Sequence, residues 1–382
     1  MKIKILTLAI SSLLFTATAI AGAGNTVTAF TATAIAGAGN TVTATTTGDS
    51  NDITAMQEGG DLNGITITQA SNLNSSAAYQ VGNNNSATID QESVSNSAEI
   101  SQGMFGASNN NSARITQQGT GSFSGGVNNV AQIVQFGDAN DATINQAVDS
   151  YALLFQRGTS NFATVDQHLG VSSSAEVYQW GDSIRATVYQ QGLFTSTATI
   201  NQGMDSNTNY GLATGSVATI NQFAGLVAGS NATINQGASN TASVNQYGDN
   251  LSTTITQTAI SNTAHVSQGT FSSDTPVTAL PTAANSKAAI TQDGTFGTVN
   301  LTQSGLGTVG DSTTVTQGTG SDYDSVTIHQ YNGDGDIVTV AQSIGDHNTA
   351  IINQGLYGNS GHVDSVDLTQ AGASNLATIT QN

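Results

Sequence analysis

The 382-residue sequence contains no cysteine, two prolines and six basic residues, and only 8% of it is charged. Without cysteine the chain has no disulfide framework, no thiol nucleophile and no zinc–thiolate site. A net charge of −19 leaves no basic surface of the kind that binds nucleic acid. Aromatic residues make up 5%, too few for the core of an ordinary globular enzyme. We therefore predict neither a nucleic-acid-binding protein nor a thiol or zinc enzyme.

What the chain does contain is glycine, alanine, threonine, serine, asparagine and glutamine, with 42 glycines among them. A disordered chain would carry more charge or more proline. This mixture instead favours a thin and regular core built from a repeated unit. We expect no cofactor, no metal site and no catalytic residue.

The N-terminus is typical of a secretory signal peptide. Lys2 and Lys4 precede the apolar stretch 5–15, and Ala19-Ile20-Ala21 is a small-residue cleavage pattern. We place the cut after Ala21, which leaves four basic and 25 acidic residues and a net charge of −21. No later segment is apolar over the length of a membrane span, so we expect no membrane insertion.

Two kinds of internal repeat are present. Residues 15–29 and 30–44 are the same fifteen residues, FTATAIAGAGNTVTA, a duplication across the predicted cleavage site. The second repeat is a glutamine that closes a short alternating run and recurs 26 times, mostly every ten to twelve residues. These glutamines are at positions 57, 69, 80, 91, 102, 117, 135, 146, 156, 167, 179, 190, 202, 222, 236, 246, 257, 268, 292, 303, 317, 330, 342, 354, 370 and 381.

Aligned on this glutamine, the ordered positions recur every second residue. The residue two before it is Ile, Val or Leu in 24 of 26 cases, and the residue six before it is Asn in 13, Ser in six and Asp in four. Period two predicts a β-strand whose inward face reads Asn-Ala-Ile-Gln. A glycine such as Gly82 or Gly137 usually follows and permits a tight turn. The sequence thus predicts an all-β solenoid of about thirteen strand-turn-strand-turn coils in two facing parallel sheets.

Stacked coils place identical side chains above one another, about 4.8 Å apart. An inward amide would be costly alone, but it can bond the same amide in the coils above and below it. The predicted assembly ladder comprises Gln80, Asn85, Gln91, Asn96, Gln102, Gln135, Asn140, Gln146, Gln156, Asn161, Gln167, Gln370, Asn375 and Gln381. The predicted apolar seam comprises Ile89, Ile100, Ile144, Val165, Ile200, Ile220, Ile234 and Ile379.

The last motif, residues 375–381, is complete, so we expect an open strand edge there that receives another coil. The apolar seam is too thin to fold the chain unaided. We therefore expect that the chain stays largely unfolded until an existing edge receives it, and that it then polymerises as cross-β structure.

The motifs resemble the curlin repeat, whose pattern is Gln-x-Gly-x-x-Asn-x-Ala-x-Ile/Val-x-Gln. Gln80–Gln91 (QVGNNNSATIDQ), Gln135–Gln146, Gln156–Gln167 and Gln370–Gln381 match it, and the resemblance covers residues 51–382. It implies a subunit of an extracellular amyloid fibre, major-subunit-like, in adhesion and biofilm matrix. It also implies export through an outer-membrane pore, a nucleator subunit as partner, and polymerisation with copies of itself.

The chain departs from the family pattern in several places. Residues 22–50 occupy the place of the family's secretion-targeting segment but show no motif of their own. Extra residues occur at 103–110, 118–128, 203–215 and 269–285, and the last stretch holds Pro276 and Pro281, which predicts a loop outside the sheets. The inward asparagine is replaced by Ile184, Leu251 and Gly297.

Other candidate sites are weaker. His168, His265, His329, His347 and His362 show neither metal-ligand nor triad spacing. The stretch 332–336 (NGDGD) resembles a fragment of a calcium loop but lacks its later glutamate, so a plain polar turn is the stronger interpretation.

Aromatic residues recur beside the repeated glutamine. Tyr79, Phe155, Tyr178 and Tyr189 are expected on the outward face, and Phe136, Trp180 and Tyr247 in turns. These rings can stack on one another or on a partner sheet. Tolerated surface residues are an equally good interpretation.

Three alternatives remain open. A monomeric solenoid adhesin would need a capped end, which the sequence does not show. An ice-binding solenoid would need a regular Thr-x-Thr face, but Asn, Asp and Tyr interrupt the outward threonines. An enzyme built on a β-helix would need clustered carboxylates on one face, which are missing.

Overall fold

The computed structural model describes residues 14–20, 24–32, 39–103, 108–118, 128–168, 172–191, 195–203, 213–223, 229–269, 283–304, 310–331, 335–355 and 364–381. Every regular element in these ranges is a β-strand. None of these ranges contains a helix that could cross a bilayer. The chain divides into two compact units, Met1–Ser183 and Ile184–Asn382, and each is considered by itself.

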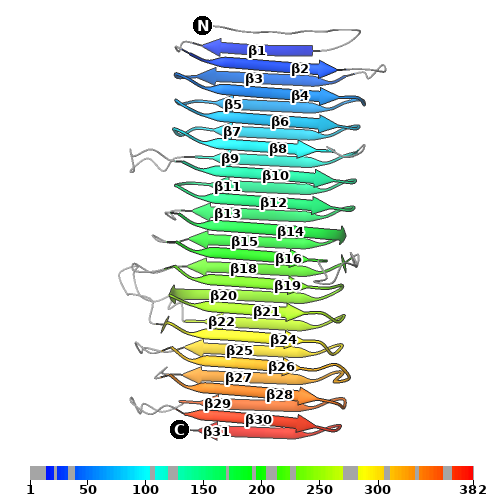
Figure 1. Cartoon of the computed structure of the whole chain (residues 1–382), viewed down its shortest axis with the longest axis vertical. Helices are drawn as coiled ribbons and strands as arrows, with labels where there is room; N and C mark the ends of the chain where they lie inside the picture. The colour runs from blue at the N-terminus through cyan, green and yellow to red at the C-terminus, as the bar shows by residue number, and fades with distance from the viewer. Residues whose placement is uncertain are drawn as a thin grey trace, which may run out of the picture. The chain divides into compact units, whose positions relative to one another are not determined.

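Unit 1 consists of two parallel sheets whose strands alternate along the chain (Figure 1). Sheet A contains β1 (Leu14–Ile20), β3 (Thr41–Thr47), β5 (Gly64–Gln69), β7 (Ser86–Gln91), β9 (Ser112–Gln117), β11 (Asp141–Gln146) and β13 (Phe162–His168). Sheet B contains β2 (Thr26–Ala32), β4 (Asp52–Glu58), β6 (Ser75–Val81), β8 (Ser97–Gln102), β10 (Val130–Phe136), β12 (Tyr151–Arg157) and β14 (Ser174–Asp182).

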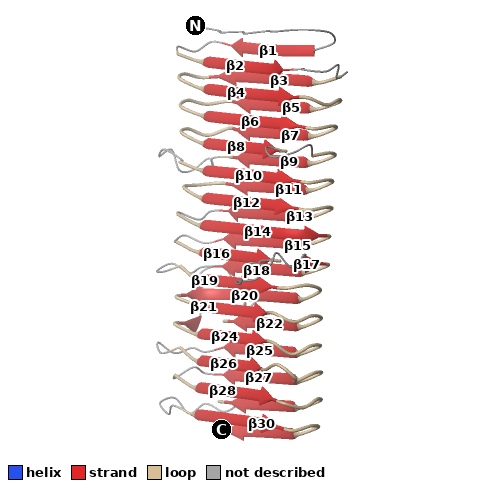
Figure 2. Ribbon diagram, turned by 45° about the vertical axis from the view of Figure 1, so that its right-hand side comes forward, coloured by secondary structure: helices blue, strands red, loops and turns tan. Residues whose placement is uncertain are grey.

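Unit 2 repeats this arrangement (Figure 2). Its sheet A contains β15 (Arg185–Gln191), β18 (Val217–Phe223), β20 (Thr241–Asp249), β22 (Thr263–Gln268), β25 (Thr298–Ser304), β27 (Ser325–Tyr331), β29 (Thr349–Gln354) and β31 (Leu376–Gln381). Its sheet B contains β16 (Thr197–Gln202), β19 (Asn231–Gln236), β21 (Ser252–Gln257), β24 (Lys287–Gln292), β26 (Ser312–Gln317), β28 (Ile337–Ser343) and β30 (Ser365–Ala371). Two-residue strands β17 (Ala213–Thr214) and β23 (Ala283–Ala284) lie off these paths.

The register is the one that the glutamine alignment predicts. Gln135 of β10, for example, pairs with Gln102 of β8 and with Gln156 of β12. All 26 glutamine motifs are strands, and consecutive glutamine-motif strands belong to opposite sheets, so two of them make one coil. The predicted all-β solenoid with two facing parallel sheets is confirmed.

The solenoid begins earlier than the first glutamine motif. Strands β2 and β3 both open with Thr-Val-Thr-Ala, one from each copy of the duplicated fifteen residues, and they pair with β4 and β5. Asn25 and Asn40, which precede them, are buried as in later coils. The first copy therefore supplies most of β1 and the opening of β2, and the second copy supplies the end of β2 and the opening of β3. Strand β1 lies inside the predicted signal peptide, whose cleavage remains a prediction.

Burial alternates along each strand because one face points into the narrow space between the sheets. The seam residues Ile89, Ile100, Ile144, Val165, Ile200, Ile220 and Ile234 are all buried. Ile379 of β31 is only half-buried, since β29 is its single strand partner among the described strands. Ile184 and Leu251 are fully buried, which confirms that they replace the inward asparagine with apolar side chains.

The turns contain a conformational regularity that the sequence pattern did not indicate. The residue immediately before the inward asparagine position has a left-handed backbone, and it is mostly serine or asparagine, as at Ser95 (φ 61°) and Asn84 (φ 56°). Its N–H donates to a turn carbonyl of the preceding coil, as from Ser95 to Asn72 (3.1 Å). The predicted turn glycines Gly82, Gly137 and Gly158 also have positive φ. The predicted extra segments lie largely outside the described residues.

Leu73 occupies this left-handed position at φ 61° and is 59% exposed. Left-handed geometry costs a residue with a Cβ about 1–2 kcal/mol, and asparagine tolerates it best after glycine. We expect Leu73→Asn to raise the free energy of unfolding by about 1 kcal/mol, measured by guanidinium titration. Leu376, 73% exposed but within β31, provides the control, because asparagine is a poor strand residue there. A loss of stability in Leu73→Asn as large as in Leu376→Asn would contradict this interpretation.

Candidate functional site

The glutamine ladder is the most regular polar feature of the core. In sheet B of unit 1 the Nε2 of Gln80 donates to the Oε1 of Gln102 (2.8 Å), and Gln102 donates to Gln135 (2.8 Å). Gln135 continues to Gln156 (2.9 Å). Sheet A has the same series, from Gln91 through Gln117 and Gln146 to Gln167. Every bond in these series points toward the strand later in the sequence, which gives the stack a direction.

The second hydrogen of each glutamine joins the two sheets. The Nε2 of Gln80 also donates to the carbonyl of Gly64 (3.0 Å), the first residue of the facing strand β5. Gln135 reaches Ser112 of β9 in the same way (2.9 Å). Because both N–H hydrogens and the oxygen of the amide make hydrogen bonds within the protein, a fully buried glutamine keeps the hydrogen bonds that it would make with water. Hydrogen-bonded glutamines therefore form a continuous series within each unit.

The ladder starts at β4 and β5. The position of the glutamine is held by Thr31 in β2 and by Thr46 in β3. The Oε1 atoms of Gln57 and Gln69 consequently have no hydrogen-bond partner among the described residues. Strands β2 and β3 therefore belong to the solenoid but not to its glutamine ladder.

The inward residues six positions before each repeated glutamine, mostly asparagine, are here called the asparagine column. Their hydrogen bonds differ from the predicted stacking of amide on amide. The Oδ1 of Asn85 accepts the backbone N–H of Asn111 (3.1 Å), and the Oδ1 of Asn140 accepts that of Asn161 (3.1 Å). The Nδ2 of Asn161 donates to the turn carbonyl of Gly181 (2.8 Å). The amide thus ties each turn to the next coil through the backbone, with side-chain pairs such as Asn375–Asn348 (2.9 Å) as additions.

Serine serves at the same position because its hydroxyl also accepts the next N–H. The Oγ of Ser216 accepts the N–H of Asn240 (3.4 Å) and donates to the carbonyl of Gly237 (2.6 Å). This explains why serine follows asparagine in frequency at this position. Among the predicted ladder residues, those before position 170 are buried. Gln370 of β30 is also buried, whereas Asn375, which precedes β31, and Gln381 of β31 are partly exposed.

Aspartate at the asparagine position introduces a buried charge. The Oδ1 of Asp324 accepts the N–H of Asn348 (2.8 Å), so the turn contact is kept. Burial raises the pKa of the Asp324 carboxyl, although its hydrogen bonds to Asn348 act in the opposite direction. Two residues earlier, the side-chain and backbone hydrogen bonds from Thr295 lower the pKa of the turn residue Asp322.

These two carboxyls predict pH effects of opposite sign. A raised pKa in the fold means that stability is lost as pH rises from the unfolded-state pKa of about 4 through the folded value. Asp324→Asn should therefore stabilise the protein at pH 7, by about 1 kcal/mol, and the gain should disappear by about pH 3. Asp322→Asn should destabilise at pH 7, with an effect that also fades in acid. The guanidinium midpoints of both variants at pH 7 and pH 3 test this prediction. If Asp324→Asn and Asp322→Asn change the stability at pH 7 in the same direction, the prediction is wrong.

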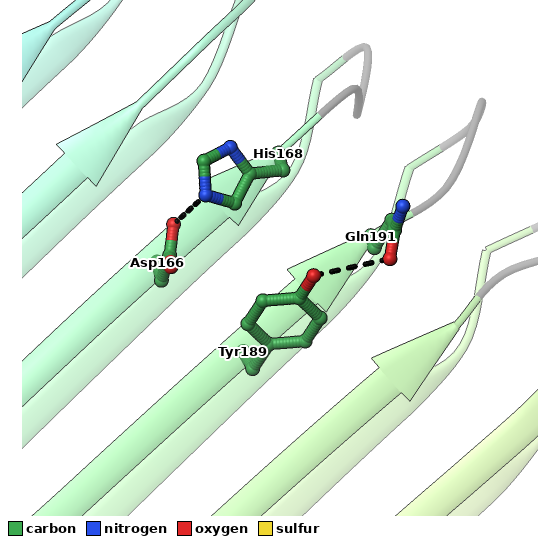
Figure 3. A network of polar contacts seen from close by, with 4 residues as sticks. All are labelled: Asp166, His168, Tyr189 and Gln191. Atoms are coloured by element: carbon green, nitrogen blue, oxygen red, sulfur yellow. Dashed lines mark hydrogen bonds and ion pairs between the residues drawn. The ribbon is translucent and has the colours of Figure 1, made fainter.

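Two polar pairs on the outward face join residues within a single strand (Figure 3). On β13 the Nε2 of His168 lies 2.7 Å from a carboxylate oxygen of Asp166. On β15 the hydroxyl of Tyr189 donates to the Oε1 of Gln191 (3.1 Å). Each pair joins residues two apart on one strand and has no third catalytic group among the described contacts.

No group of three or more His, Cys, Asp or Glu that could hold a metal occurs in the described part of the chain. In the predicted calcium-loop fragment, residues 332–334 lie outside the described residues. Asp336 is buried in the asparagine column, where its Oδ1 accepts the N–H of Asp364 (2.9 Å). His362 also lies outside the described residues.

Comparison with known proteins agrees with this repeat. The family model described as "Curlin associated repeat" matches residues 60–92, 149–181 and 237–269. Each match covers three consecutive strands, β5–β7, β12–β14 and β20–β22. No curated protein matches the chain. Proteins of this family are structural rather than catalytic. Three separate matches, and a glutamine ladder in the same register through each unit, make this chain a member of the curlin-repeat family.

Proposed function

We propose that the protein is the repeating subunit of an extracellular fibre, in which copies join end to end by stacking their coils. The observation that supports this is the one-directional glutamine ladder. Each coil from β4 onward offers Nε2 donors on one side and Oε1 acceptors on the other, so these coils add through one repeated set of bonds. Where a second copy presents β2 and β3, which have Thr31 and Thr46 at the glutamine position, backbone pairing between strands would join the two copies.

Strand β31 illustrates such a contact surface. Leu376 is 73% exposed, Ile379 is half-buried, and β29 is the one described strand that pairs with β31. A strand edge with free N–H and C=O groups and an apolar seam beside them recruits another strand. The large negative charge keeps copies apart until that edge forms.

The wider role rests on the family. We propose adhesion and biofilm matrix as the fibre's purpose, with secretion after removal of residues 1–21, passage through an outer-membrane pore and nucleation by a partner subunit. Residues 22–50 would then follow the cleavage site, with strands β2 and β3 in the first coil of the fibre.

Negative-stain electron microscopy and fibre diffraction of the chain, taken hours after removal of denaturant, test this proposal. Unbranched fibrils with a meridional spacing of about 4.8 Å are expected. Discrete rods that do not lengthen at high concentration would exclude it and would favour a monomeric adhesin.

A further inference from the structure

The outward surface of sheet B in unit 1 is apolar over three neighbouring strands. Strands β10, β12 and β14 lie side by side in sheet B, and their outward positions alternate with the buried ones. The large apolar residues at these outward positions, here called the aromatic patch, are Val130, Val134, Phe136, Tyr151, Leu153, Phe155, Tyr178 and Trp180. All are exposed or half-exposed, with Val130 at 41% and Tyr151 at 38%.

The fold does not require this patch. On the opposite face of the same coils, β11 and β13 carry mostly polar outward residues such as Thr143, Asn145, Thr164 and Asp166. Outward positions there tolerate threonine and aspartate without disturbing the ladder beneath them. A contiguous apolar surface on a secreted chain marks an interaction site.

The rings of the patch stack on one another. Phe155 lies 5.5 Å from Phe136 and 5.3 Å from Trp180, the second pair at an interplanar angle of 27°. The guanidinium of Arg157 lies 5.3 Å from the centre of the Trp180 ring. One stacked pair and two tilted pairs thus engage the rings with one another within the patch. A sugar ring needs an exposed aromatic face, whereas the flat surface of another β-sheet packs on ring edges and aliphatic groups.

Charge complementarity selects a second copy of the same patch. The chain has six basic residues against 25 acidic ones, and Arg157 lies at the margin of the patch. Glu176 pairs in register with Leu153, toward the other end of β12. When two patches meet with antiparallel strands, β12 over β12, each Arg157 comes over Tyr151 of the other copy, two residues along β12 from Leu153, which is the residue paired with Glu176. The alternative with parallel strands brings Arg157 against Arg157.

We propose that the aromatic patch is a lateral interface between two copies of this chain, packed sheet on sheet with antiparallel β12 strands. This association uses a sheet face, whereas the fibre proposal uses strand edges. It can therefore be tested on dimers in solution whether or not fibres form.

Disulfide trapping is the most direct test, because the chain has no cysteine of its own. Antiparallel packing places Leu153 of one copy opposite Phe155 of the other. A mixture of full chains carrying Leu153→Cys and Phe155→Cys should give disulfide-linked heterodimers under mild oxidation, identified by mass spectrometry. Full chains carrying Thr143→Cys or Thr164→Cys, on the opposite face, should give about tenfold less. Equal yields from both faces would overturn the proposal.

Charge exchange tests the orientation without removing any ring. Arg157→Glu and Glu176→Arg should each weaken dimerisation in sedimentation velocity, by about tenfold, and the double variant should restore it. Loss without restoration overturns the antiparallel arrangement. A different outcome would make the proposal wrong. If Leu153→Cys and Phe155→Cys form no heterodimer but weaken the binding of the chain to a neutral polysaccharide such as cellulose, the patch binds a sugar ligand.

Discussion

Gln135→Leu is expected to be among the most damaging single substitutions in the chain. The side chain of Gln135 is fully buried, accepts a hydrogen bond from Gln102 and donates to Gln156 and to the carbonyl of Ser112. Leucine fills a similar volume but leaves the Oε1 of Gln156 and the Ser112 carbonyl without these donors. Unsatisfied buried groups cost about 1–3 kcal/mol each, so we expect a loss of about 3–5 kcal/mol.

The same strand provides the control. Gln132 is on the outward face of β10, where its Nε2 donates to Glu99 at 3.1 Å in an exposed contact. Gln132→Leu should change the free energy of unfolding by less than about 0.5 kcal/mol. Guanidinium titration followed by circular dichroism compares the two, and fibril growth rates can be measured on the same samples. Similar losses in both variants would mean that the ladder is not what stabilises the core.

The glutamine ladder could be predicted from the sequence because its signal is strictly periodic. A glutamine repeated 26 times, two residues after Ile, Val or Leu in 24 of them, fixes the face, the end of each strand and the register between coils. Once coils stack in register, a glutamine such as Gln135 has only the neighbouring glutamines and the facing strand within reach. The period of the pattern therefore determines both the fold and the amide contacts.

The asparagine column shows where this reasoning stops. Asparagine is one methylene shorter than glutamine, and it stands where the chain leaves a turn, so the nearest donor is the backbone N–H of the next coil. Periodicity reports which residues are inward but not which backbone groups a turn leaves without partners. That distinction follows from turn geometry, which single-residue spacing does not encode.

Strand lengths and the first coils were missed for a related reason. Phe136, Trp180 and Tyr247 were expected in turns, and this is wrong, because β10, β14 and β20 continue past the glutamine. Outward rings that stack across neighbouring strands favour extended backbone there. Strands β2 and β3 lack the terminal glutamine, so an alignment on glutamine could not find them.

Gly158→Ala is the second substitution with a large expected effect, and it concerns the turns alone. Gly158 has φ 126°, a backbone that side chains with a Cβ rarely adopt. A Cβ there would also collide with the carbonyl oxygen of Gly181 in the next coil. The carbonyl of Gly158 itself accepts the Nδ2 of Asn140 (3.0 Å), so a displaced turn would also break the asparagine column. We expect a loss of about 3–5 kcal/mol from strain, collision and the lost hydrogen bond together.

Gly59→Ala separates backbone strain from close stacking. Gly59 has φ 66°, but no atom of a neighbouring coil lies within 4 Å of the place that a Cβ would occupy, so only the left-handed backbone opposes alanine. That strain amounts to about 1 kcal/mol. If the two variants unfold at the same guanidinium concentration, consecutive turns do not stack as closely as the contact between Gly158 and the Gly181 carbonyl implies. If Gly158→Ala alone prevents both folding and fibril growth, close approach of consecutive turns is a condition for adding each coil, within one copy and between copies alike.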